Sequence, residues 1–120
     1  MLKIKIANTE FEYIEALETE QYYNGASRRT LTVTCASDAV GLDVLNALLV
    51  EKNLGVITLT NDEMGVTNYH ESYVLKLECG IKNTMVQAET PESAAVYADR
   101  LVFKLGKRTY IEEQLHKLGL

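Results

Sequence analysis

The sequence predicts a mainly β fold of the α+β class: an antiparallel β-sandwich or partly closed barrel of about seven strands. One helix should lie between the third and fourth strands, and a short helix should close the chain. Apolar and polar residues alternate with period two in several runs, as in strands with one buried face. Asn24-Gly25, between two such runs, suits the positive φ angles of a tight hairpin turn. The chain shows neither a regular strand-helix alternation nor an internal repeat.

Three extended runs open the chain. The second carries a series of glutamates, so one of its faces should be exposed and acidic. In the third, apolar residues alternate with threonines, which predicts one buried face and one solvated face. The three runs are Lys3 to Ile6, Glu10 to Tyr23 and Arg29 to Cys35, with Leu31, Val33 and Cys35 inward in the third.

The predicted hairpin between the second and third runs has a defined register. With Asn24 and Gly25 as its two turn residues, Glu20 faces Arg29 across the hairpin, which is a favourable pair. Glu18, however, then faces the apolar Leu31. This mismatch predicts either a bulge or a partly uncovered end of the sheet.

A helix follows the third run. Ser37 or Asp38 can cap its start, and we expect it to end near Asn53 and Gly55. Its apolar residues recur at helical spacing. They are Leu42, Leu45, Leu48 and Leu49.

About four strands and a second helix complete the chain. The run from Val56 to Thr60 enters another hairpin through the polar residues 61–65, and Gly80 marks a bulge or bend after the strand from Tyr73 to Cys79. A short strand from Met85 to Ala88 and a turn or loop at residues 90–93 precede the last strand. The residues expected to face inward in these strands are Ile57 and Leu59, then Tyr73, Leu75, Leu77 and Cys79, then Leu101, Phe103 and Leu105. After the last strand, Thr109 and Glu112 form a capping box, in which each side chain bonds to the backbone of the other. The helix that it starts carries Ile111, Leu115 and Leu118 on one side.

Length and composition set the class of protein. A chain of 120 residues with 47% apolar residues can bury one core, so we expect residues 1–120 to form a single domain. The net charge of −5 argues against a nucleic-acid partner. The sequence shows neither a signal peptide nor a membrane-spanning stretch, which predicts an intracellular location or assembly from an intracellular pool. Cys35 and Cys79 are predicted to be buried thiols.

The sequence offers little chemistry for catalysis. His70 and His116 stand far apart without companion ligands, so neither a metal site nor another cofactor is expected. The seven glycines are scattered and form no phosphate-binding loop, and no nucleophile motif occurs. The glutamates of residues 10–20 are expected to form a solvated face rather than a catalytic pair. We therefore expect a protein that is not an enzyme.

The candidate protein-binding residues are Tyr22, Tyr23, Arg28 and Arg29, which flank the predicted hairpin turn. Tyrosine and arginine dominate the energetics of protein interfaces. The alternative is that one tyrosine packs on the sheet edge while the arginines neutralise nearby glutamates.

Charge is also uneven along the chain. Residues 1–20 carry two lysines and five glutamates, a net charge of −3, whereas residues 100–120 have a net charge of +3. These segments could pair as neighbouring strands within one molecule. On opposite faces they would instead favour head-to-tail association of copies of the chain.

Four segments resemble small proteins encoded in phages and prophages of Gram-positive bacteria, often among tail or baseplate genes. They are LKIKIANTEFEYIEA, YYNGASRRTLTV, LDVLNALL followed by GVITLTND, and RLVFKLGKRTYIEEQL. The resemblance implies a structural or assembly role in the virion, with other tail proteins and further copies of the chain as partners. Tube subunits of that kind carry a long loop or extended arm, and the sequence gives no sign of one, which favours a peripheral tail accessory protein.

Two rival functions remain open at this point. A small acidic protein could instead be a phage-encoded inhibitor that blocks a host defence protein by mimicking the charge of nucleic acid. A β-barrel that binds a small ligand would show a discrete apolar cavity with convergent polar groups.

Overall fold

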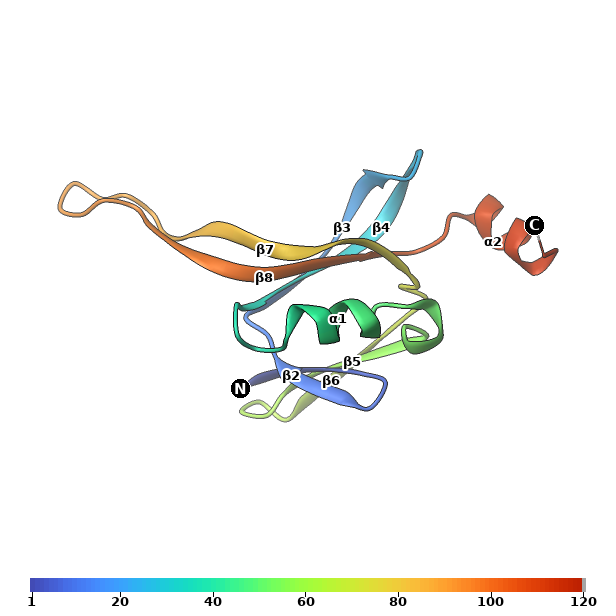
Figure 1. The fold of residues 1–120 in the computed structure, drawn as a ribbon, viewed down its shortest axis with the longest axis horizontal. Coiled ribbons are helices and arrows are strands. Elements are labelled where there is room, and N and C mark those ends of the chain that lie inside the picture. The colour runs from blue at the N-terminus through green and yellow to red at the C-terminus, as the bar shows by residue number, and fades with distance from the viewer. Residues whose placement is uncertain (120) are drawn as a thin grey trace.

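The fold is mainly β, as predicted. The computed structural model describes residues 1–119, in which eight strands form two antiparallel sheets, ordered β2-β1-β5-β6 and β3-β4-β8-β7 (Figure 1). Within these residues both sheets are open. The elements are β1 (Leu2–Ile6), β2 (Thr9–Glu12), β3 (Glu15–Tyr23), β4 (Ala26–Ala36), α1 (Leu42–Leu48), the 3-10 helix η1 (Glu51–Asn53), β5 (Val56–Asn61), β6 (Val66–Glu71), β7 (Leu75–Gln87), β8 (Val96–Gly106) and α2 (Tyr110–Lys117).

The extended run from Glu10 to Tyr23 is two strands rather than one. β2 belongs to the first sheet and β3 to the second, and the chain changes sheets between Tyr13 and Ile14. The Tyr13 N–H donates to the carbonyl of Leu2 in β1 at 3.1 Å, and the Ile14 N–H donates to the carbonyl of Thr34 in β4 at 2.7 Å. The first helix therefore follows the fourth strand, not the third. The alternation of apolar and polar residues does not reveal this change of sheet, because the backbone stays extended from β2 into β3.

The hairpin turn at Asn24-Gly25 is confirmed. Tyr23 pairs with Ala26, and the turn residues have φ angles of 54° and 81°. Glycine reaches this left-handed region without the steric cost that a Cβ atom imposes.

Substitution of Gly25 by alanine should therefore lower the free energy of unfolding by about 1 kcal/mol. A Cβ at this position would meet no atom within 4 Å, so the loss reports backbone strain alone. Urea denaturation measures it, with Ser27→Ala in the same hairpin as the matched control. Ser27 is exposed, and its replacement should change stability by less than about 0.5 kcal/mol. Equal stability of the two variants would contradict the strain argument.

The predicted register of this hairpin also holds, with Glu20 opposite Arg29 and Glu18 opposite Leu31. The pairing of β3 with β4 runs without a shift, so the predicted bulge is wrong, and Leu31 opposite Glu18 is fully buried. Glu18 is exposed, and its carboxylate accepts a hydrogen bond of 2.5 Å from the hydroxyl of Tyr73. The mismatch is thus resolved by a polar partner at the edge of the core.

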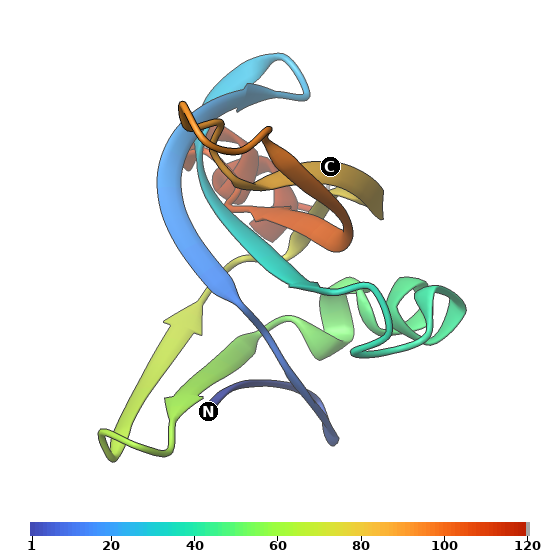
Figure 2. The same cartoon turned by 90° about the vertical axis from the view of Figure 1, so that its left-hand side faces the viewer.

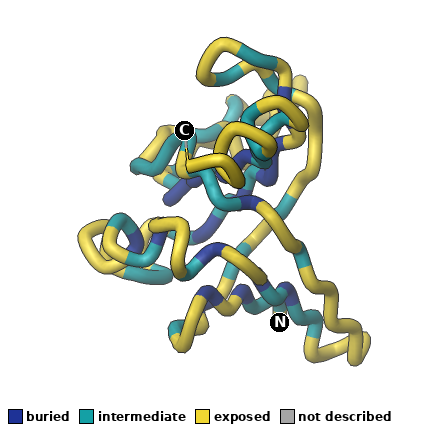
Figure 3. Tube along the Cα trace, turned by 90° about the vertical axis from the view of Figure 1, so that its right-hand side faces the viewer, coloured by how far each residue is buried: buried dark blue, intermediate teal, exposed yellow. Residues whose placement is uncertain are grey.

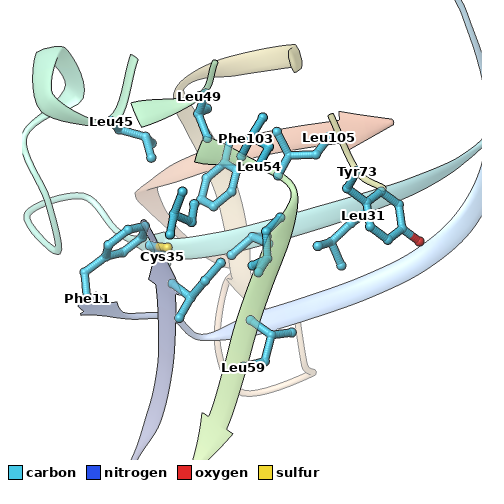
Figure 4. Close-up of a cluster of buried hydrophobic side chains, with 14 of the residues drawn as sticks. Phe11, Leu31, Cys35, Leu45, Leu49, Leu54, Leu59, Tyr73, Phe103 and Leu105 are labelled. Carbon is cyan, nitrogen blue, oxygen red and sulfur yellow. The ribbon is translucent and has the colours of Figure 1, made fainter. Parts of the chain in front are cut away.

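One hydrophobic cluster joins both sheets and the α1 segment (Figure 4). Phe103 lies in it, with its ring centroid 6.3 Å from that of Phe11 in the other sheet. The predicted inward residues of β4, β5 and β8 are all buried, whereas Leu75, Leu77 and Cys79 of β7 are half-buried. The buried members are Ile4, Ile6, Phe11, Leu31, Val33, Cys35, Leu45, Leu49, Leu54, Ile57, Leu59, Tyr73, Leu101, Phe103 and Leu105.

The first helix is shorter than predicted. It begins at Leu42 after Gly41, so neither Ser37 nor Asp38 caps it, because the chain first turns away from the end of β4. Leu45 and Leu49 are buried as expected. The remainder of the predicted helix becomes η1, which ends at Asn53. No helix within residues 1–119 combines the length and apolar character needed to cross a membrane.

The sequence prediction of no extended arm is wrong. β7 and β8 form one long hairpin that projects beyond the rest of the molecule (Figure 1), where a bend at Gly80 and a separate short strand at residues 85–88 were expected. The register shifts lie instead between Lys76 and Glu78 and between Met85 and Gln87. The radius of gyration is 16.0 Å, against about 14 Å for a compact chain of this length. We call residues 82–99 the arm.

Candidate protein-interaction site

The hairpin tip separates the four predicted contact residues into two pairs. Alternation along the paired strands places Tyr22 and Arg29 on one face and Tyr23 and Arg28 on the other. Tyr22 is 73% exposed, and Arg29 is exposed as well. Arg28 is only 2% exposed. The tip therefore offers Tyr22 and Arg29 to a partner, while Tyr23 and Arg28 make contacts within the chain.

Arg28 joins three parts of the chain. Its guanidinium donates to the carbonyls of Tyr23 and Lys107, each at 3.0 Å. It also forms a two-pronged pair with the carboxylate of Glu112 in α2, with N–O distances of 2.6 and 3.0 Å. This geometry is the strongest that arginine makes with a carboxylate. Arg28 therefore fastens α2 to the base of the hairpin.

Glu112 has a second partner at the start of α2. Its carboxylate accepts from the backbone N–H of Thr109 at 2.8 Å, while the Thr109 hydroxyl accepts from the N–H of Glu112, so the predicted capping box is confirmed. The bonds from Arg28, and after them the bond from Thr109, lower the pKa of Glu112 to about 2. The carboxylate thus remains charged, and the attachment of α2 persists, throughout the neutral and mildly acidic range.

Tyr23 links the two edge strands of its sheet. Its hydroxyl donates to the carboxylate of Glu78 in β7, and Lys104 of β8 lies 3.1 Å from the same hydroxyl. β3 and β7 are at opposite edges of this sheet, so the contact requires the strong curl seen in Figure 2. Hydrogen bonds from Lys82, and after it from Tyr23, lower the pKa of Glu78 to about 2. The curl fixes the direction in which β7 and β8 leave the core.

The second helix exposes its apolar side. Ile111, Leu115 and Leu118 share that side as predicted, yet Ile111 is 70% and Leu118 is 73% exposed. Charged contacts hold the helix instead: Glu112 pairs with Arg28, and Arg108 pairs with Glu51. Figure 3 shows α2 as an exposed helix at the chain end. We define the α2 surface as Tyr110, Ile111, Leu115 and Leu118.

The arm exposes a second apolar surface. β4 pairs with β8 only from Arg100 to Gly106, so in the described chain the arm is a ribbon of two strands. Met85 and Tyr97 pair across it and are 52% and 58% exposed. These exposed apolar side chains on a protruding element make the arm a candidate contact surface. We define the arm surface as Met85, Val86, Val96 and Tyr97.

A turn closes the tip of the arm. Pro91 occupies the position that its fixed φ favours in a β-turn, and Thr90 and Ser93 pair through both backbone and side-chain atoms. The turn or loop expected at residues 90–93 is therefore a defined turn. Glu89 and Glu92 beside it are exposed, which gives the tip a negative charge.

The two histidines lie in different environments. His70 of β6 lines an open hollow of about 450 Å³, and its Nδ1 is 3.5 Å from the carboxylate of Glu18. That carboxylate already accepts from Tyr73, whose pKa is raised by burial and by this bond. His116 lies on the exposed α2 beside Glu51. Among residues 1–119, no three His, Cys, Asp or Glu side chains are grouped to hold a metal ion.

Sequence reasoning identified the hairpin tip and the apolar side of α2 but missed the arm. The alternation of Ile81, Asn83 and Met85 was the available signal, since these residues continue the inward face of β7 beyond Cys79. Polar Asn83 and the glycine at position 80 interrupt the apolar pattern there. Comparison with known protein families, with curated proteins and with solved structures finds no match for this chain.

Proposed function

We propose that this chain is a non-enzymatic structural or assembly protein of a phage tail or baseplate that acts through contacts with other proteins. The observation that carries the proposal is the arm, whose apolar residues Met85 and Tyr97 pair with each other and remain 52% and 58% exposed. A two-stranded ribbon is marginally stable alone in water. Such an element gains stability when a neighbouring protein covers it.

The rest of the molecule serves as a support for these contact elements. We interpret the two sheets as a β-sandwich that buries the apolar residues of the core strands between its sheets. Its curl directs the arm outward, and Arg28 holds α2 in place. Tyr22 and Arg29 at the hairpin tip add a third contact element, with Tyr23 and Arg28 positioning it. An extended arm is also what the resemblance to tail proteins implies for a subunit that joins its neighbours.

Mass spectrometry of purified particles tests this role. Particles from a strain that carries the gene should contain the chain in a fixed ratio to other tail proteins. A variant in which Asn-Gly replaces residues 83–99, between the paired Lys82 and Arg100, should fold but be absent from the particles. If the wild-type chain stays in the cytosol and does not copurify with particles, the structural role is wrong.

A second candidate function is an inhibitor of a host defence protein. The exposed carboxylates of Glu12, Glu15 and Glu20 along β2 and β3 favour it, because spaced negative charges resemble a phosphate backbone. The same particle experiment separates the two, since an inhibitor would remain in the cytosolic fraction with its target.

A further inference from the structure

The arm surface and the α2 surface lie at opposite ends of the molecule. Figure 1 places the tip of the arm at one end of the longest axis, which measures 59 Å, and α2 at the other end. Both surfaces consist of exposed apolar side chains on elements that are marginal by themselves, a two-stranded ribbon and a helix of eight residues. Each therefore benefits from being covered by another protein.

The two ends carry opposite charge. The tip of the arm presents Glu89 and Glu92, and residues 88–95 contain no basic residue. At the other end, Lys117 of α2 is exposed, whereas Lys107 lies over the ring of Tyr73 and Arg108 is paired with Glu51 and Glu113. The two glutamates of α2 are engaged there, Glu112 by Arg28 and Glu113 by Arg108. Complementary charge steers two surfaces together and fixes their orientation.

This arrangement disfavours a symmetric pairing of like ends. Two arms placed together would bring the four carboxylates of two copies of Glu89 and Glu92 close to one another. Contact between the arm of one copy and the α2 surface of another instead brings apolar side chains together and places the acidic tip of the arm near Lys117. A contact between two different surfaces of the same chain is either made twice in a closed antiparallel dimer or repeats from copy to copy in a ring or a filament.

We propose that the partner of the arm is a second copy of this chain, whose α2 surface receives it. This inference rests on the proposed function of the arm as a contact element and specifies its partner. Met85 and Tyr97 of one copy pack against Ile111 and Leu115 of the next, and Glu89 and Glu92 approach Lys117.

A complementation experiment tests the head-to-tail contact. One variant carries Met85→Thr and Tyr97→Thr, which keep strand-forming residues in the arm. The other carries Ile111→Gln and Leu115→Gln, which keep helix-forming residues in α2. By light scattering, wild type should form a dimer or a larger species, and each variant alone should be a monomer. An equimolar mixture should form a dimer and stop there, because only one intact arm and one intact α2 surface meet.

A control variant and two contrary results complete this test of the head-to-tail contact. Met64→Gln alters an exposed methionine in the turn between β5 and β6 and should associate as wild type does. Wild type that remains a monomer at millimolar concentration, or a mixture that yields no dimer, would overturn the inference. Such a result together with the chain in purified particles would leave the structural role intact and assign the arm to another protein. Head-to-tail association without the chain in particles would instead refute the structural role.

Charge reversal gives an independent check. Glu89→Lys with Glu92→Lys should weaken association on the order of tenfold at low salt. Lys117→Glu in a second copy should restore part of the loss when the two variants are mixed. Association that is unchanged by either reversal would contradict the assigned orientation.

Discussion

Replacement of Phe103 by alanine should lower the free energy of unfolding by about 3 to 5 kcal/mol. Phe103 is completely buried, and its ring packs beside Phe11 of the other sheet, so its removal opens a cavity where the two sheets meet. The neighbouring side chains come from strands and cannot collapse freely into the space. Urea denaturation followed by circular dichroism measures the loss.

Tyr69→Ala is the matched control for this substitution. It removes an aromatic ring of similar size from β6, but Tyr69 is 67% exposed, so stability should change by less than about 1 kcal/mol. A loss below about 1 kcal/mol for Phe103→Ala would show that the sheets are not held together by this cluster.

Replacement of Glu112 by alanine should cost about 3 kcal/mol, because it leaves the guanidinium of Arg28 buried without its carboxylate partner. The value lies at the low end for buried pairs, since Glu112 itself remains partly in contact with water. Chemical denaturation measures the cost. Glu113→Ala is the control: its pair with Arg108 is longer, at 3.9 Å, and its loss should cost less than about 1 kcal/mol.

The same pair predicts a dependence on pH. The pKa of Glu112 falls from 4.5 to about 2 on folding. A carboxyl group with a lowered pKa adds stability above its unfolded pKa and loses that stability as the pH falls toward the folded value. Wild type should therefore lose stability between about pH 4.5 and pH 2, and Glu112→Ala should lose less over this range. Part of the slope remains in the variant because the pKa of Glu78 is lowered similarly. Parallel curves for the two proteins would contradict the role of Arg28.

Local signals in the sequence predicted the parts of the fold that depend on neighbouring residues. The Asn24-Gly25 turn, the alternation in β4 and β8 and the capping box at Thr109 each depend on a few adjacent residues. The passage from β2 to β3 and the start of α1 depend on contacts with distant strands. Tyr13 bonds to β1 and the next residue bonds to β4, which no periodicity encodes.

The contact site was predictable to a similar extent. The types of residue at the hairpin tip indicated a surface, yet only the structure shows that Arg28 is used to hold α2 while Arg29 stays exposed. The helical spacing of the apolar residues in α2 is typical of a helix that packs one side on the core. The structure leaves Ile111 and Leu118 exposed, and the Arg28–Glu112 pair that holds α2 joins residues far apart in the sequence.

The claim that the arm joins copies of this chain is tested most directly by amide hydrogen exchange at low and high protein concentration. At high concentration, exchange should slow in residues 83–87 and 96–99 and in α2, because association covers both, while exchange in β4 should stay the same. If the arm and α2 exchange at one rate across the whole concentration range, the chain does not associate through them.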